Sequence, residues 1–186
     1  MKNLSFVLLM GLLISGCRNE DTFPDIPTLE YKKLVFGDDS GIKTFTLTAT
    51  FTDGDGDVGY YLDRPNEAIF DDSLSDYYYN YVIELQVQKN GIWKDTIIFY
   101  EDIEYNIDSI DSDNDTTIVF YNDHTSARLP YLTPEGQNKG LKGDIEKTAY
   151  LPFLLGDTIR FRAFIYDRAL NKSNEIFTPG FFVRNP

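Results

Sequence analysis

The chain has very few of the residues on which many proteins build their stability or chemistry. Cys17 is the only cysteine and His124 the only histidine among 186 residues. No disulfide can form within the chain, so its stability must come from a hydrophobic core. One histidine, which we interpret as a surface-loop residue, cannot build a zinc cluster or a serine–histidine–aspartate triad.

Positive charge is also scarce. Lysine and arginine together number 17, against 30 acidic residues, which gives a formal net charge of −13. So acidic a chain repels phosphate backbones, and we therefore expect no nucleic-acid partner. The hydrophobic content of 42%, with 15% aromatic residues, nevertheless argues against disorder. We expect one folded domain with an acidic surface.

The one long hydrophobic run lies at the N-terminus. Lys2 precedes an apolar stretch, Leu4–Ile14, and two small residues then lead to Cys17. The run is too short to cross a bilayer as a mature helix and has the order of a secretory signal peptide. The residues Ile-Ser-Gly-Cys resemble the lipobox of bacterial lipoproteins, which implies removal of residues 1–16 and acylation of Cys17, with palmitate as a typical acyl group. The alternative is a soluble secreted protein whose cysteine happens to follow the signal.

Residues 17–30 follow as a predicted flexible tether. They contain Pro24 and Pro27 and show no periodic apolar pattern. A dozen extended residues could reach about 40 Å. Glu20 and Asp21 resemble the export signal that sends some lipoproteins of the Bacteroidota to the outer face of the outer membrane. We therefore expect lipid anchoring to the outer membrane, with exposure at the cell surface.

From residue 31 to residue 186 the apolar pattern has the period of a β-strand. In KTFTLTATF, residues 43–51, phenylalanine, leucine and alanine alternate with threonine. The same alternation returns at 79–87 and at 158–166, and Asn90-Gly91 has the turn chemistry of a two-residue hairpin whose return strand is 92–100.

Weaker patterns predict four more strands and one short helix. The strands are expected at 31–36, 117–122, 141–150 and 176–183, with Pro179 restricting the last to a sheet edge, and the helix near 67–72. Seven or eight strands with almost no helix predict an all-β fold, an antiparallel two-sheet β-sandwich. A closed barrel is the main rival.

Two polar loops follow strands of this pattern. The first contains DGDGDVG, Asp53–Gly59, and the second contains DRALNKSN, Asp167–Asn174. With the strands before them, FTDGDGDVG and YDRALNKSN resemble motifs of small, flavobacterial-type Bacteroidota lipoproteins with an immunoglobulin-like domain. The resemblance implies an immunoglobulin-like sandwich at the membrane. Leu170 departs from these motifs, because glycine is more usual at that turn position.

Immunoglobulin connectivity would bring the two loops to the same pole of the sandwich. Converging carboxylates without basic partners repel one another, and a hard divalent cation with oxygen ligands relieves this repulsion. The sequence therefore suggests a calcium site, with the candidate ligands Asp53, Asp55, Asp57, Asp167 and Asn171.

The alternative is turn chemistry alone. In that interpretation the aspartates cap backbone amides, and Arg64 or Arg168 balances the charge. An EF-hand is excluded, because its glycine and glutamate positions hold Val58 and Arg64. A second acidic run, DSDNDT at 111–116, lacks the glycines and is interpreted as a solvated insertion.

No pair of residues stands out as catalytic, so we expect a non-enzyme. The leading hypothesis is a lipid-anchored interaction module that binds a protein partner. The alternative is carbohydrate capture for a glycan system, on an aromatic platform formed by Trp93, Tyr77 and Tyr78. Aromatic residues that pack the core or a sheet face would give the same pattern.

Overall fold

The computed structural model describes residues 23–39, 42–62, 65–96, 99–101, 120–122, 125–132, 140–151 and 157–183. The predicted signal peptide, Cys17, Arg64, His124 and the second acidic run lie outside these residues. None of the described helices is long and apolar enough to cross a membrane.

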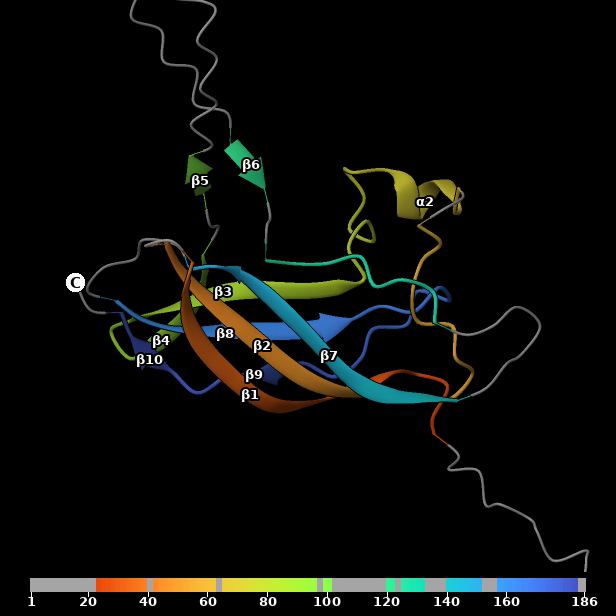
Figure 1. The fold of residues 1–186 in the computed structure, drawn as a ribbon, viewed down its shortest axis with the longest axis horizontal. Coiled ribbons are helices and arrows are strands. Elements are labelled where there is room, and N and C mark those ends of the chain that lie inside the picture. The colour runs from red at the N-terminus through yellow and green to blue at the C-terminus, as the bar shows by residue number, and fades with distance from the viewer. Residues whose placement is uncertain are drawn as a thin grey trace, which may run out of the picture.

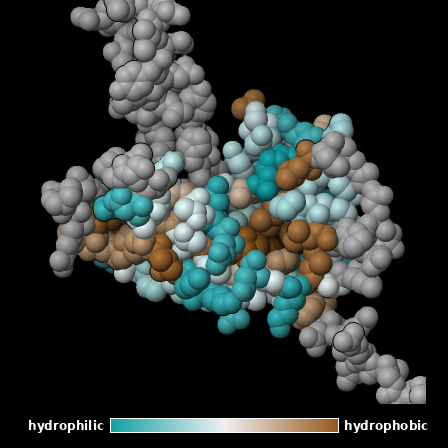
Figure 2. Space-filling view, in the orientation of Figure 1, coloured by the Kyte–Doolittle hydropathy of each residue, from teal (hydrophilic) through white to brown (hydrophobic). Residues whose placement is uncertain are grey.

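Three long strands form the first sheet. β1 (Thr28–Asp39), β2 (Ile42–Asp53) and β7 (Leu141–Tyr150) pair antiparallel in the order β1-β2-β7. The alternation of β2 buries its apolar side chains in the core and places its threonines on the other face, where the hydroxyl groups of Thr46 and Thr148 lie 2.7 Å apart. Figure 2 shows a hydrophilic band over this sheet.

The second sheet has five strands. β3 (Tyr81–Lys89), β4 (Ile92–Thr96), β8 (Thr158–Ile165) and β10 (Phe181–Phe182) pair in the order β10-β8-β3-β4, and β9 (Ile176–Phe177) also pairs with β8. Asn90 and Gly91 both have positive φ angles, 54° and 78°. These angles fit the type I′ turn expected for this hairpin.

The two sheets pack face to face around one core (Figure 1). Phe45 of β2 stacks on Phe161 of β8, with ring centroids 4.0 Å apart, and Leu47 and Ile83 are fully or almost fully buried. Neither sheet closes on itself, so the fold is a sandwich and the rival barrel is excluded. The strand orders match the immunoglobulin arrangement, in which strands 1, 2 and 5 of that fold oppose strands 3, 6 and 7.

Several element boundaries differ from those predicted. β1 begins at Thr28, inside the segment predicted as tether. The predicted strand 92–100 divides into β4 and β5 (Phe99–Glu101); β5 pairs with β6 (Phe120–Asn122) in a ribbon that stands apart from both sheets. The segment 176–183 divides into β9 and β10, which flank Pro179.

The predicted short helix is present as α2 (Ala68–Asp71). Arg128 holds this segment against the sandwich: its guanidinium donates to the carbonyl oxygens of Phe70 and Tyr78 and pairs with the Asp71 carboxylate at 2.8 Å. The same guanidinium lies 4.6 Å from the centroid of the Tyr78 ring. One cation therefore holds both α2 and the residues that lead into β3.

Candidate metal centre

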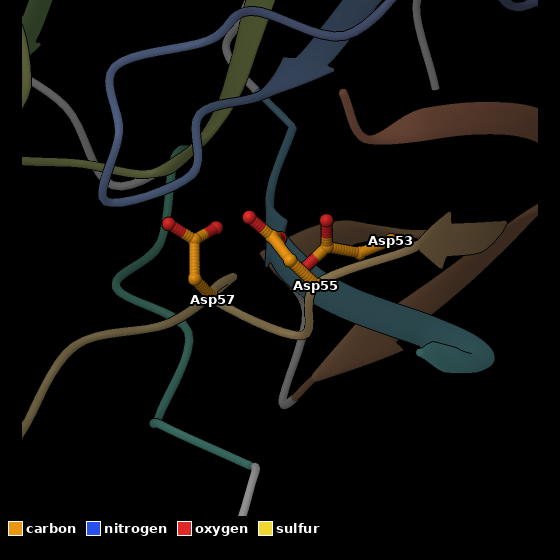
Figure 3. Close-up of side chains that lie close together, drawn as sticks. All are labelled: Asp53, Asp55 and Asp57. Carbon is orange, nitrogen blue, oxygen red and sulfur yellow. The ribbon is translucent and has the colours of Figure 1, made fainter. Parts of the chain in front are cut away.

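The three aspartates of the first polar loop converge at one end of the sandwich. Asp53 is the last residue of β2, and Asp55 and Asp57 lie in the loop that follows. Each offers a carboxylate oxygen, and these oxygens all lie within 4.8 Å of one another. In Figure 3 the carboxylates stand side by side and point toward the loop that follows β8. We call this end, with the Asp53–Gly59 loop and the Asp167–Asn171 turn, the aspartate pole.

Local backbone geometry explains why alternate residues meet in this way. Gly56 and Gly59 take φ angles of 73° and 106°, which L side chains rarely adopt. Val58 is buried in the core, and its amide donates to Oδ2 of Asp53 at 3.0 Å. Val58 also pairs as an antiparallel bridge with Asp167, so the two polar loops are joined directly. The predicted convergence of the two loops is therefore present.

Each of the three aspartates has a buried carboxylate oxygen without a hydrogen-bond donor in the described chain. Asp53 has 0% of its surface exposed, yet within the described part of the chain its Oδ1 receives no hydrogen bond. The Oδ1 atoms of Asp55 and Asp57 are likewise buried and without a described donor. Buried acceptors are normally satisfied, and an unsatisfied one is costly. Three such oxygens at one place form a group that could hold a metal ion.

The pKa values of the clustered carboxyl groups reflect the same burial and the same lack of donors. Burial raises the pKa of Asp53 to about 6, against the opposing hydrogen bond from Val58, and the carboxylates of Asp55 and Asp167 raise it further. Burial also raises the pKa of Asp57 to about 7, with additional repulsion from the neighbouring carboxylates and partial relief from Arg168. The folded state therefore loses stability when these carboxyl groups ionise next to one another.

Asp167 belongs to the cluster by position, but its side chain is already engaged. Both its carboxylate oxygens accept hydrogen bonds from Asn171: Oδ1 from the backbone amide at 2.7 Å and Oδ2 from the side-chain amide at 2.8 Å. Burial still raises the pKa of Asp167, and the charge of Asp55 adds to the shift. Asn171 thus orients Asp167 toward the other loop, as a supporting residue would around a metal.

Two neighbouring residues have structural roles. Leu170 adopts a φ of 67°, the left-handed conformation that glycine would take at this turn. Asn174, at the end of the second polar loop, exchanges two hydrogen bonds of 2.9 Å with the backbone of Leu29 and so ties β1 to the second sheet. Asn174 is thereby used in the fold.

The segment that enters the domain is fixed at the same pole. The amide of Gly54 donates to the carbonyl oxygen of Pro24 at 2.8 Å. A Cβ atom at Gly54 would lie only 2.2 Å from the carbonyl oxygen of Phe23, so the close approach requires glycine. The sequence motif shows the glycine but not this use of it, since no local pattern connects Gly54 with a proline thirty residues earlier.

The donor set fits calcium. Ca²⁺ takes six to eight oxygen ligands in a flexible arrangement, and carboxylates are its commonest protein ligands. The unpartnered oxygens of Asp53, Asp55 and Asp57 supply a first group, and waters or backbone carbonyls would supply the rest. Arg168 does not neutralise the cluster: its Nε donates to the carbonyl oxygen of Asp57, and it forms no ion pair with a carboxylate of the described chain.

A cavity of about 440 Å³ adjoins the cluster. Asp57 and Arg168 form one wall, and Tyr61, Asn66 and Phe70 are among the residues on the others. Arg168 is held in place by the ring of Tyr131, whose centroid lies 4.3 Å away, and by a hydrogen bond to the Tyr61 hydroxyl. Sequence patterns give no signal for this cavity, because its residues come from three separate segments.

The aromatic candidates for sugar binding lie at two different places. Trp93 in β4 opposes Gln88 near the end of β3, whereas Tyr77 and Tyr78 precede the start of that strand. Trp93 packs below the Arg160 guanidinium, 4.5 Å from its ring centroid. The Tyr77 ring contacts Tyr166 edge to face. The structure thus does not bring the three rings into one platform.

Comparison with known proteins adds no family assignment: no family model, no curated protein and no solved structure matches this chain.

Proposed function

We propose that this protein is a lipid-anchored, non-catalytic binding module of the cell envelope whose immunoglobulin-like domain holds a calcium ion at the aspartate pole. The observation that carries the calcium proposal is the fully buried Asp53, whose Oδ1 lacks a donor in the described chain and faces two more such carboxylates. A divalent cation would convert their mutual repulsion into attraction. The anchor is supported by the lipobox-like residues that end at Cys17.

Calcium is preferred over magnesium for two reasons. Mg²⁺ demands near-ideal octahedral geometry and gives up its waters reluctantly, whereas Ca²⁺ accepts irregular rings of carboxylates. The loop supplies its aspartates at alternate positions between glycines, which is a flexible and irregular frame.

Thermal unfolding tests the calcium site. The full chain, purified from membranes in non-ionic detergent, is melted in calcium, in magnesium and in chelator. A ligand that binds only the folded state adds about 2.7 kcal/mol at a hundred times its dissociation constant. We expect the melting temperature to rise in calcium, to rise much less in magnesium, and to lose its calcium response in Asp55→Asn.

Asp144→Asn is the matched control. Asp144 is also an aspartate beside β2, but it is exposed and already paired with Lys32 and Thr50. Its replacement should leave the calcium response intact. Identical melting curves of the wild type in calcium and in chelator would contradict the calcium site and favour the alternative, in which the aspartates only form turns and cap backbone amides.

Fractionation tests the anchor. Cys17→Ala should prevent lipidation and shift the protein out of the detergent-soluble membrane fraction. If the variant still fractionated with membranes as the wild type does, the anchor proposal would be wrong, whatever the result for calcium.

A further inference from the structure

The aspartate pole is also the end at which the chain arrives from its proposed anchor. Phe23 and Pro24 lie against Gly54, between two of the clustered aspartates. Only five residues lie between Cys17 and Phe23, and the chain from Cys17 to Phe23 spans at most about 20 Å when fully extended. The twelve residues of β2 run roughly 40 Å from this pole to the opposite end. The pole is therefore the part of the domain held nearest to any membrane that carries the anchor.

Exposed aliphatic side chains gather around this pole. Leu62 follows the aspartate loop, Leu132 follows a segment hydrogen-bonded to Tyr60, Leu170 lies in the Asp167 turn, and Ile26 lies just beyond Pro24. All four are exposed. Figure 2 shows hydrophobic residues between α2 and the start of β7, the region of the first two of these segments. Single exposed leucines are ordinary, but four on adjoining loops at one end are a surface suited to insertion.

Charge alone would oppose contact between this pole and a membrane. The clustered carboxylates would repel the phosphate groups of lipids, and the chain as a whole carries a net charge of −13. A bound divalent cation reverses the local sign. Because three aspartates provide only part of the coordination sphere of calcium, a lipid phosphate oxygen can replace one of the waters that would complete it.

We infer that the aspartate pole is a membrane-docking face, on which the exposed aliphatic side chains enter the headgroup region while the bound cation meets lipid phosphates. This inference rests on the proposed anchor and calcium site and goes beyond them, because a tethered domain need not touch its membrane. Docking fixes the orientation of the sandwich: the β1–β2 and β3–β4 hairpins then point away from the bilayer and are presented to partners.

Two positions of nearly equal exposure provide the test. Leu62 at the aspartate pole is 64% exposed, and Ile92 at the opposite end is 63% exposed. Each is changed to cysteine, Leu62→Cys or Ile92→Cys, in the lipidated protein, where Cys17 is blocked, and is labelled with an environment-sensitive fluorophore. The protein is reconstituted into vesicles of phosphatidylcholine and phosphatidylglycerol with brominated acyl chains, in calcium or in chelator.

We expect several-fold stronger quenching at position 62 than at position 92, and a fall at position 62 alone when calcium is chelated. Leu132→Cys should behave as Leu62→Cys does, which guards against a local effect of one label. Equal quenching at both ends would overturn the docking, even if melting curves showed calcium binding. Strong quenching at position 62 that ignores the chelator would overturn the role of the cation. A free thiol at Cys17 would instead overturn the anchor, and the docking with it.

Discussion

The sandwich carries two groups of charged side chains, which differ in whether their charges are compensated by neighbouring opposite charges and hydrogen bonds. On the outer face of the five-stranded sheet, Arg162 lies between three carboxylates: Glu84 at 2.5 Å, Asp95 at 3.2 Å and Glu175 at 3.9 Å. Gln86 extends this network by donating to Asp95 and accepting from Arg160. We call this group the sheet network. Each of its acids has a cation or an amide beside it.

The aspartate pole has the opposite composition. Its clustered acids have carboxylate oxygens within 4.8 Å of one another and form no ion pair with a cation of the described chain, and three of their oxygens lack donors there. The sheet network is complete as the chain folds, so its role is structural. The pole carries buried carboxylate oxygens without donors in the described chain, so it is the region that we propose for a cation.

The largest effect that separates the two regions is expected for Asp53→Asn. In chelator, the amide removes a buried negative charge but keeps an oxygen for the Val58 amide, so the variant should be more stable than the wild type by about 2 kcal/mol. In calcium, it should be less stable than the wild type, because a ligand is lost. Melting curves of both proteins under both conditions measure this reversal.

The control variant Asp95→Asn tests whether the stability gain is specific to the aspartate pole. Asp95 belongs to the sheet network, so its replacement should never stabilise the protein, with or without calcium. A stability gain for Asp95→Asn equal to that of Asp53→Asn would mean that general acidity, and not the pole, is responsible.

The next effect is on the pH dependence of the melting temperature, which should have opposite signs in chelator and in calcium. The folded-state pKa values of Asp53 and Asp57, about 6 and 7, exceed the usual 3.8, so the folded state binds more protons than the unfolded state between these limits. Their favourable contribution is present below about pH 4 and is lost as pH rises through 6 and 7. In chelator the melting temperature should therefore fall between about pH 4 and pH 7.

In calcium the trend should reverse over the same range, because protons compete with the cation for the aspartates. Titration of the melting temperature against pH, with and without chelator, checks both trends. Parallel curves under the two conditions would contradict the calcium site.

A smaller effect is expected from the sheet network. Arg162→Met should cost about 1 kcal/mol, since the ion pairs of this arginine are partly exposed and screened by solvent. The loss should be equal in calcium and chelator and should shrink at high salt. Urea unfolding measures it, and Arg162→Lys, which keeps the charge, should recover part of it. A calcium-dependent loss would show that the two regions are coupled.

The smallest effect concerns the turn that carries Asp167. Leu170→Gly should stabilise the protein by about 0.5 kcal/mol, because release from a left-handed backbone outweighs the extra freedom of glycine in the unfolded chain. Leu170→Ala keeps a Cβ atom and should bring no gain. Urea unfolding compares the two, and a loss for both would show that packing of the leucine side chain matters more than its φ angle.

Much of the fold could be predicted from periodicity. The apolar alternation in β2, β3 and β8 is clear because each strand has one face in the core, and Asn90-Gly91 marks the hairpin because both residues tolerate positive φ. The first and last residues of β1 could not be predicted as well from the sequence. Its first residues, from Thr28, pair with the end of β2 across a long separation that no local pattern reveals.

The residues of the candidate site could be predicted from the sequence, but their burial and hydrogen bonding could not. Immunoglobulin connectivity brings the loops of Asp53 and Asp167 to one pole, as the structure shows. Burial of Asp53, the missing donors and the engagement of Asp167 by Asn171 depend on packing between distant segments, which one-dimensional patterns do not contain. For the same reason the sequence suggested one cluster of Trp93 with Tyr77 and Tyr78, whereas β3 separates them.

In the proposed anchored protein, the contact between Pro24 and Gly54 would also determine how the domain bears mechanical load. A partner pulling on the far hairpins would draw the domain away from its tether, along the direction in which β1 runs. The antiparallel pairing of β1 with β2, from Thr28 opposite Thr52 to Asp39 opposite Ile42, would then be loaded in shear, so its hydrogen bonds resist together. The first contact to bear the force is the amide of Gly54, between Asp53 and Asp55. A cation that stiffens this loop would thereby strengthen the clamp through which tension enters the fold.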